Sequence, residues 1–277
     1  MKKQRFKWSN LYLIFIFIVL YAPIAFLIFY SFNDGGTMTS FTGFTLDNYA
    51  AVFEDTRLIG IVLNTLLVAL LSSLIATTIG TFGAIGIYFV KKRETRNAVL
   101  SFNNILLVSP DVIIGASFLI LFTFIGFRLG FVSVLLSHVA FSIPIVVLMV
   151  LPKLQEMNDT MIKAARDLGA NTWQVLLKVI LPSITPGILA GYFMAFTYSL
   201  DDFAVTFFVT GNGFTTLAVE IYSRARQGVS LEINALSALM FVFALILVIG
   251  YYFIQQHNMT KKQKNKKRQH AEAVSMR

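Results

Sequence analysis

The sequence predicts an all-α, polytopic membrane protein with six transmembrane helices. Hydrophobic residues make up 56% of the 277-residue chain and charged residues only 13%, which is about half the charged share of a soluble domain. The mean hydropathy is +0.72. Long apolar runs follow one another along the chain, and Lys and Arg gather beside them. A soluble protein with this composition would expose large apolar patches, so a membrane location is the simpler interpretation.

Each apolar run is close to the ~20 residues that a helix needs to cross about 30 Å of hydrocarbon. Lipid offers no hydrogen-bond partner to an open backbone group, so all six runs are expected to be helical. In chain order, the predicted spans are Leu11–Phe32, Leu58–Val90, Val99–Phe127, Phe131–Leu151, Ser183–Val209 and Ile233–Ile254.

Individual runs carry further signals. The first is too long for the apolar part of a signal peptide and lacks a clear small-residue cleavage site, so we interpret it as an uncleaved anchor. The second exceeds a minimal span and is expected to tilt or protrude. The third is interrupted by Ser109-Pro110-Asp111. The fourth contains His138, which we expect to be a hydrogen-bonded packing residue and not a ligand.

The distribution of positive charge predicts the orientation. With the N-terminus inside, all of the 23 Lys and Arg residues face the cytoplasm except Arg57, Arg128, Arg224 and Arg226. Cytoplasmic loops carry this excess in membrane proteins, so both termini and the loop 152–182 are predicted to be cytoplasmic. The net charge of +9 therefore reflects topology, and we expect no nucleic-acid partner.

The runs form one predicted transmembrane domain over residues 1–260. The remaining segment, 261–277, contains KKQKNKKRQ. We predict that it is a disordered cytoplasmic tail that rests against anionic lipid. The chain has no cysteine, which excludes a disulfide scaffold.

The loop 152–182 is polar but patterned as two short helices. Asn158 can cap the first helix, and Gly169 is suited to end it. Asn171 or Thr172 can cap a second helix from Trp173 to Leu181. Each predicted helix has a small apolar face, formed by Met161, Ala164, Ala165 and Leu168 in the first and by Trp173, Leu176, Leu177 and Ile180 in the second. Such faces suit either a partner's groove or the membrane surface, and amphipathicity alone does not separate the two.

This loop resembles the EAA loop of ABC importer permeases, which reads E-A-A, three residues, Gly, nine residues, then I-x-L-P. The matching residues are Ala164, Ala165, Asp167, Gly169, Leu181 and Pro182. There are two departures: Lys163 replaces the Glu of the motif, and Val179 stands for its Ile. The resemblance implies that the loop docks into a cytoplasmic ATPase, although the reversed charge at Lys163 removes the contact that the Glu of the motif would make.

The resemblance extends over nearly the whole chain. The stretches SPDVIIGASFLILF, SLDDFAVTFFVTG and EIYSRARQGVSLEINALS are similar to PotC-type permeases of spermidine/putrescine importers. This similarity implies the type I importer (MetI-like) fold, a bacterial inner-membrane location and alternating access. It also implies a homologous PotB-type permease, ATPase subunits and an extracytoplasmic polyamine-binding protein as partners. The chain is then a non-enzymatic subunit without a cofactor of its own, since ATP and Mg²⁺ bind the ATPase.

Carboxylates within apolar runs are the candidate substrate contacts. Asp111 lies within the third run, and Asp201 and Asp202 lie towards the outer end of the fifth. A carboxylate at membrane depth costs several kcal/mol and is functional by default, although Asp111 could merely cap a half-helix after Pro110. Tyr198 precedes Asp202 by four residues, so both can share one helix face. Only one of the two adjacent aspartates is expected to face the path.

These residues suit a cationic substrate. Carboxylates bind ammonium groups, and aromatic rings contact cations and methylene spacers. A related importer for thiamine or chelated iron is an alternative. An ion-coupled secondary transporter is another, but such a protein needs no coupling helices and often carries inverted repeats. Glu220, Arg224 and Arg226 are predicted to lie on an external surface that meets the binding protein.

Overall fold

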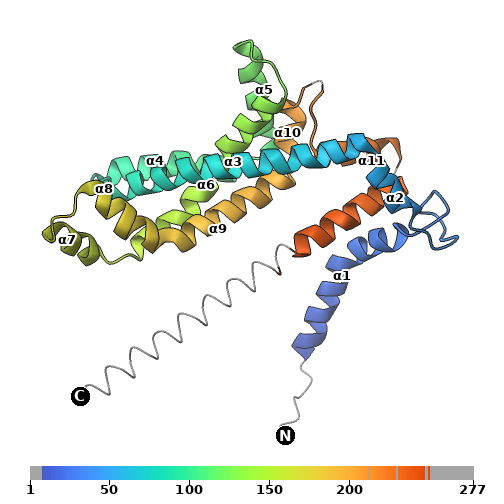
Figure 1. The fold of residues 1–277 in the computed structure, drawn as a ribbon, viewed down its shortest axis with the longest axis horizontal. Helices are drawn as coiled ribbons and strands as arrows, with labels where there is room; N and C mark the ends of the chain where they lie inside the picture. The colour runs from blue at the N-terminus through green and yellow to red at the C-terminus, as the bar shows by residue number, and fades with distance from the viewer. Residues whose placement is uncertain (1–7, 212, 229, 247–248, 250–277) are drawn as a thin grey trace, which may run out of the picture. The chain divides into compact units, whose positions relative to one another are not determined.

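A computed structural model describes residues 8–211, 213–228, 230–246 and 249 (Figure 1). The fold is mostly helical, as predicted. In these residues there is no β-strand, only an isolated antiparallel bridge between Asn33 and Phe44. The basic tail 261–277 and the N-terminal cations before Trp8 lie outside the described residues.

The helices are α1 (Trp8–Tyr30), α2 (Asp47–Glu54), α3 (Thr56–Phe89), α4 (Arg93–Val108), α5 (Asp111–Phe124), α6 (Phe131–Gln155), α7 (Asp159–Asp167), α8 (Thr172–Val175), η1 (Leu176–Ile180), α9 (Leu181–Leu200), α10 (Ala204–Val209) and α11 (Leu217–Gln227).

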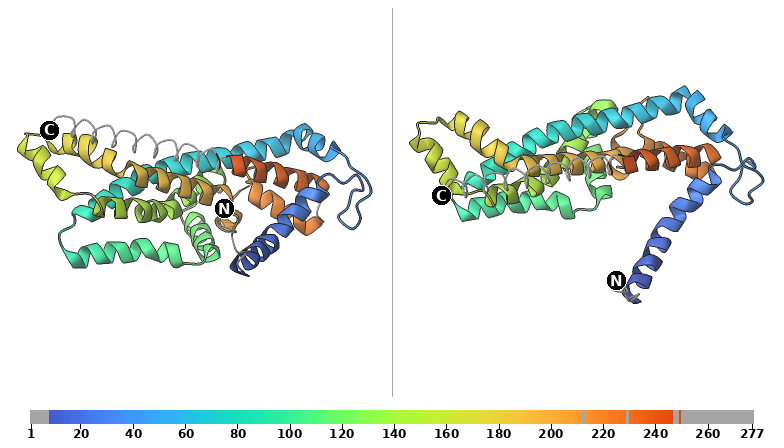
Figure 2. Two further views of the ribbon diagram at one scale, coloured as in Figure 1. Left: turned by 90° about the horizontal axis from the view of Figure 1, so that it is seen from below. Right: turned by 60° about the horizontal axis from the view of Figure 1, so that its bottom comes forward.

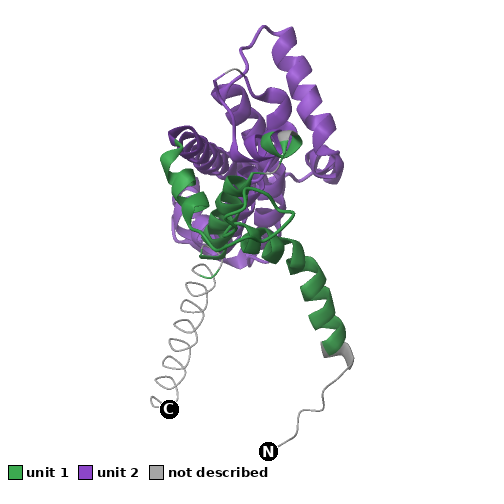
Figure 3. Ribbon diagram, turned by 90° about the vertical axis from the view of Figure 1, so that its right-hand side faces the viewer, with its two compact units in different colours: residues 1–55, 224–277 green, residues 56–223 purple. Residues whose placement is uncertain are grey.

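The chain divides into two compact units, residues 1–55 with 224–277 and residues 56–223 (Figure 3). In the first unit, the segment after α1 is folded around the buried side chain of Asn33. Its amide nitrogen donates to the carbonyl oxygens of Thr37 (2.8 Å) and Ser40 (2.9 Å), and its amide oxygen accepts from the backbone N–H of Thr42 (2.8 Å). One buried amide thus satisfies three backbone groups of a loop that has no regular secondary structure.

The second unit is built on α3, α6 and α9, which pack against one another along much of their length (Figures 1 and 2). Small residues let these helices approach closely, as is usual where helices associate in lipid. A methyl group on Gly80 of α3 would lie 2.7 Å from Cβ of Val146 on α6. The α5 and α10 helices form a second packed pair in the same unit.

Among the described residues, four helices are long and apolar enough to cross a membrane: Leu11–Tyr30, Thr56–Phe89, Phe131–Gln155 and Thr172–Leu200. They correspond to the first, second, fourth and fifth predicted spans. The third predicted span is divided into α4 and α5, which meet at a 104° bend. Pro110 has no N–H and disfavours helical backbone in the residue before it, which explains a break at Ser109. Of the sixth predicted span, the structure describes an apolar helix over Leu231–Ile246.

The fifth predicted span also ends earlier than expected. It was predicted to continue to Val209, but α9 stops at Leu200 and the short helix α10 begins only at Ala204. The prediction of one continuous helix through Asp201 and Asp202 was therefore wrong. Aspartate favours helix starts because its side chain bonds nearby backbone N–H groups, and at this point it starts a new helix.

The loop 152–182 contains the predicted caps. The side chain of Asn158 accepts from the backbone N–H of Thr160, and Asn171 and Gln174 form a reciprocal capping box. Gly169 follows the first helix with φ +83°, a conformation that glycine adopts without strain. The second predicted helix is not separate, however. It consists of α8 and the π-helix η1 and runs without a break into α9.

We expect Gly80→Ala to destabilise the protein, because the added methyl group would lie 2.7 Å from Val146 Cβ and 3.1 Å from the Ile143 carbonyl oxygen. Overpacking of this kind costs about 1–3 kcal/mol. The thermal midpoint of the purified full-length chain in detergent measures the effect. Gly86→Ala on the same helix is the control, because no atom of the described residues lies within 4 Å of its added methyl group. Equal midpoints for the two variants would contradict the close approach of α3 and α6.

Candidate functional site

Asp111 is the first residue of α5, directly after the break at Pro110. At this position its negative charge is stabilised by the positive end of the helix dipole. The hydroxyl of Tyr198 on α9 lies 3.1 Å from its Oδ1 and 3.3 Å from its Oδ2 and donates to the carboxylate. The structure therefore brings together two of the predicted path residues from runs that are distant in sequence.

The ring of Tyr198 is held by an aromatic contact. Phe141 on α6 packs edge-on against it, with ring centroids 5.4 Å apart, and lies 4.9 Å from the ring of His138. Tyr198 nevertheless remains 40% exposed. The phenol is thus oriented by its neighbours while one side stays open to a ligand.

Asp202 has a different environment. Its side chain is buried, and its carboxylate accepts from the backbone N–H groups of Val205 (3.3 Å) and Thr206 (2.8 Å) and from the Thr206 hydroxyl (2.8 Å). The carboxylate caps the first turn of α10, and Asp202 lies outside α9. The prediction that Tyr198 and Asp202 share one helix face was wrong, because the helix ends between them.

His138 connects this cap to the rest of the unit. The fully buried ring lies with Nε2 2.8 Å from the Thr206 hydroxyl and 3.4 Å from Asp202 Oδ2, and with Nδ1 2.6 Å from the Ser199 hydroxyl. Ser199 in turn lies 2.9 Å from the hydroxyl of Ser72 on α3. The prediction of a hydrogen-bonded packing histidine is confirmed.

Sequence reasoning missed Ser72, Ser199 and Thr206. Their signal was weak, because single Ser and Thr residues occur in many apolar helices, where the hydroxyl usually bonds the preceding turn. What could have drawn attention to them is that hydroxyls within spans often hydrogen-bond across helices. Only the fold shows that these three converge on one histidine.

Asp201 is the exposed member of the adjacent pair. It follows the last residue of α9, and its side chain faces outward while that of Asp202 is buried. Asp111, Tyr198 and Asp201 are therefore the predicted path residues that a ligand can reach. Two carboxylates and a phenol favour a cation, because both charge and ring attract it.

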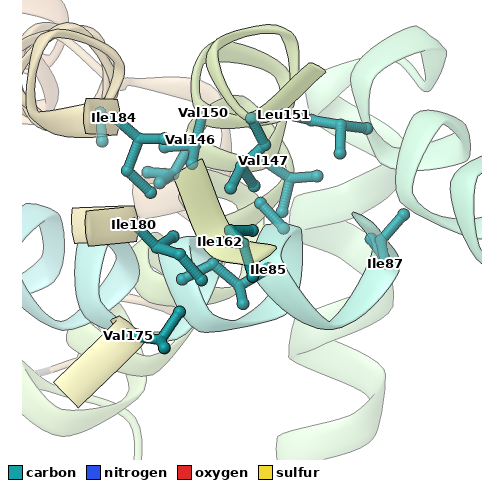
Figure 4. Close-up of a cluster of buried hydrophobic side chains, with 13 residues drawn as sticks. Ile85, Ile87, Val146, Val147, Val150, Leu151, Ile162, Val175, Ile180 and Ile184 are labelled. Atoms are coloured by element: carbon teal, nitrogen blue, oxygen red, sulfur yellow. The ribbon is translucent and has the colours of Figure 1, made fainter. Parts of the chain in front are cut away.

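The loop 152–182 is anchored from its inner side. Ile162 on α7 and Val175 on α8 are buried in the main apolar cluster of this unit, with Ile85, Val147 and Ile180 (Figure 4). Within the motif, Ala165 and Leu181 pack against the same cluster, whereas Lys163, Ala164, Asp167, Gly169 and Pro182 are exposed. The Tyr88 hydroxyl at the end of α3 donates to Asp159 Oδ1 (2.5 Å).

Away from the core, this loop exposes a set of four large apolar side chains. Its members, which we call the loop face, are Met161 (49% exposed), Leu168 (89%), Trp173 (62%) and Leu177 (48%). The predicted face of the first helix was partly wrong, because Ile162 and Ala165 turn towards the core while Met161 and Leu168 turn away. Large apolar side chains that a loop leaves exposed are suited to contact a partner or a membrane.

The predicted external surface of Glu220, Arg224 and Arg226 also needs a correction. Glu220 is buried, and its Oε2 lies 2.9 Å from an Arg57 guanidinium nitrogen. This pair borders a pocket of about 580 Å³. In the other unit, Arg224 lies 3.4 Å from Asp55 and 3.6 Å from Glu232. Glu220 thus forms an ion pair with Arg57 at the start of α3 and does not present its carboxylate to solvent.

Comparisons with known proteins agree with this architecture. A family model described as a binding-protein-dependent transport system inner membrane component matches residues 76–263. The spermidine/putrescine transport system permease protein PotC of Escherichia coli (strain K12) is 37% identical over 239 residues, which cover 86% of this chain and 90% of PotC. The putrescine transport system permease protein PotI of the same strain is 32% identical over 268 residues, covering 95% of this chain and 94% of PotI.

A solved structure has the same fold. A chain of a bacterial ABC transporter involved in the import of the acidic polysaccharide alginate matches with a TM-score of 0.70 and 19% sequence identity, over 88% of this chain and 92% of that one. The likeness establishes the type I ABC importer permease fold for the described part of the chain. It carries no information about the substrate.

We expect His138→Ala to lower the free energy of unfolding by about 2 kcal/mol or more, because Asp202, Ser199 and Thr206 would each lose a buried partner. Ser137→Ala is the control, since the Ser137 hydroxyl is equally buried but, among the described residues, bonds only the Ser133 carbonyl oxygen of its own helix. Thermal midpoints in detergent compare the two variants. If His138→Ala lowers the thermal midpoint no more than Ser137→Ala does, the hydrogen bonds of His138 do not stabilise this site.

Proposed function

The chain belongs to the family of binding-protein-dependent transport system inner membrane components, and on that premise we propose that it is the permease subunit of an ABC importer for polyamines. The observation that carries the proposal is the 37% identity with a spermidine/putrescine permease over 90% of that protein's length. Members of this family are transport subunits, so the activity is movement of a solute across the membrane.

The site residues that a ligand can reach supply the chemistry that a polyamine needs. Putrescine and spermidine are flexible cations with ammonium groups separated by methylene chains. Asp111 and Asp201 offer carboxylates to the ammonium groups, and the ring of Tyr198 offers a face for methylene packing and cation–π contact. Asp202 acts indirectly in this scheme, since its carboxylate caps α10 and fixes the break that leaves Asp201 exposed.

We further propose six transmembrane spans with both termini in the cytoplasm. The bent pair α4 and α5 then counts as the third span, and Leu231–Ile246 belongs to the sixth. The cations beside α4 and in the loop 152–182 support this orientation. On this topology, the loop face lies on the cytoplasmic side and the segment between α1 and α3 lies outside.

The loop face is the proposed docking site for the ATPase. Its apolar side chains suit a groove in a partner, and Lys163, Ala164, Asp167, Gly169 and Pro182 lie exposed beside them. Ala165 and Leu181 anchor the loop to the core from behind. ATP and Mg²⁺ belong to the ATPase in this assembly. A PotB-type permease and an extracytoplasmic polyamine-binding protein complete the importer.

Transport then proceeds by alternating access. The binding protein delivers the polyamine to the outer side, and its ammonium groups exchange water for the carboxylates of Asp201 and Asp111. Closure of the ATPase pair moves the loop 152–182. Since α8, η1 and α9 are continuous, that motion reaches Tyr198, whose hydroxyl contacts Asp111. The contact provides a route by which loop position changes the site.

Asp111→Asn and Asp201→Asn are each expected to lower the rate of polyamine uptake about tenfold, because each removes a charge-assisted contact worth ~1.5–3 kcal/mol. Uptake of labelled putrescine and spermidine, each in competition with the other, by cells that express the complete importer measures the effect. Glu54→Gln controls for loss of an exposed carboxylate elsewhere. Full uptake by both aspartate variants would exclude the carboxylate path, and uptake independent of this chain would exclude the proposed function itself.

Gly169→Pro is expected to uncouple transport, because proline cannot adopt φ +83° and the turn between α7 and α8 would change. Gly169→Asn is the matched control, since asparagine tolerates this conformation better than other residues. Co-purified ATPase and ATP-driven uptake are measured for both. A fully active Gly169→Pro complex would count against docking through this loop.

A further inference from the structure

A pocket at the turn between α3 and α4 is unused by the proposed transport cycle. Its volume is about 420 Å³, within the range of ~300–1,000 Å³ that is typical of ligand pockets. We call it the basic pocket, and it is lined by Val90, Lys91, Arg93, Arg96, Asn97 and Leu100. The turn lies at the same end of this unit as α7 and α8 (Figure 1), and the Tyr88–Asp159 hydrogen bond joins α3 to α7 close by.

The charge in the basic pocket is unbalanced. Among the residues that the structure describes, no carboxylate lies within 4.0 Å of the nitrogens of Lys91, Arg93 or Arg96. Glu94 is exposed beside Arg93, and Asp159 accepts from the Tyr88 hydroxyl. Arg96 is half-buried, so its charge is less screened by water than that of a surface arginine. Three cations in one concavity without a paired acid favour an anion there.

The backbone adds to this field. The α4 helix begins at Arg93, and its N-cap residue Lys92 makes no side-chain hydrogen bond to the first turn. The N–H groups of that turn and the positive end of the helix dipole therefore remain available to an anion. These N–H groups add to the attraction that the three cations exert on an anion. The pocket itself is defined by its side chains.

The position of the basic pocket indicates which anion it takes. No charged residue occurs from Leu58 to Val90, and Lys91 is the first after that apolar stretch. In the described structure, α4 has no buried residue, and its apolar side chains Phe102 and Val108 are 74% and 82% exposed. A cation cluster at the end of a span, next to an exposed apolar helix, lies at the level of the phospholipid headgroups.

We propose that the basic pocket binds the phosphate group of an anionic phospholipid. The guanidinium groups of Arg93 and Arg96 pair with phosphate oxygens, for which their planar fork is suited, and Lys91 adds a point charge. Val90 and Leu100 contact the apolar part of the lipid next to the headgroup. A bound lipid at this turn also rests against the α3 end that Tyr88 links to the loop 152–182.

The test uses the intact importer, purified in detergent and stripped of bound lipid by washing. Short-chain phosphatidylglycerol is titrated, and the thermal midpoint of the complex is followed, because a ligand that binds the folded state raises it. Short-chain phosphatidylcholine is the zwitterionic control, and inorganic phosphate is the soluble arm. The variants are Arg96→Gln, which removes a pocket cation, and Lys92→Gln, which removes the same charge from the same turn outside the pocket lining.

We expect saturable stabilisation by phosphatidylglycerol, a loss of affinity of about tenfold in Arg96→Gln, and less than about twofold in Lys92→Gln. Equal losses of phosphatidylglycerol affinity in the two variants would mean that the lipid responds to general surface charge, and this result would overturn the proposal. Equal stabilisation by inorganic phosphate would assign the pocket to a soluble phosphate compound, against the lipid. Loss of co-purified ATPase from Arg96→Gln with lipid affinity unchanged would make the pocket a protein contact and would also overturn it.

Discussion

The carboxylate of Asp202 is the contact on which the structure of the proposed path depends. An interrupted helix in a membrane leaves backbone N–H groups without partners, and lipid supplies none. Here the interruption after Leu200 is closed by one carboxylate that accepts from two N–H groups and a hydroxyl. The His138 ring on α6 lies 3.4 Å from that carboxylate, and Ser199 and Ser72 extend the cluster to α9 and α3. A single buried cluster thus permits a break that would otherwise be costly.

Both breaks in the second unit have the same use. One lies before Asp111 and the other follows Leu200. The first leaves Asp111 partly exposed and the second leaves Asp201 exposed, each at the end of a helix. An unbroken helix would have directed the fifth-run aspartates sideways into neighbours or lipid. This chain therefore places carboxylates among apolar helices by interrupting those helices, and the interruption after Leu200 is stabilised by buried residues.

The sequence predicted those structural features that depend on contacts between residues close together in the chain. The caps at Asn158 and Asn171 and the glycine at 169 were predicted because each satisfies neighbouring backbone groups. The interruption at Pro110 was also predicted, but its 104° angle was not. The end of α9 and the burial of Ile162 in place of Met161 were not predicted either, because each depends on contacts between distant segments. Glu220 illustrates the same limit, since its partner Arg57 is distant in sequence and no pattern in either segment connects them. The presence of carboxylates was readable, but the separate roles of Asp201 and Asp202 were not.

The uninterrupted course of α8, η1 and α9 has a mechanical consequence. From Thr172 to Leu200 the chain is helical without a break over 29 residues, which corresponds to a path of about 43 Å at 1.5 Å per residue. A tilt of about five degrees around its midpoint displaces each end by roughly 2 Å, comparable to the difference between a made and a broken hydrogen bond. The π-helix η1 has a wider turn than an α-helix and lies near the α8 end of this segment. A change in its winding can alter the torsion there without interrupting the helix. The backbone between Trp173 and Tyr198 is therefore a continuous helical connection from the loop 152–182 to the site.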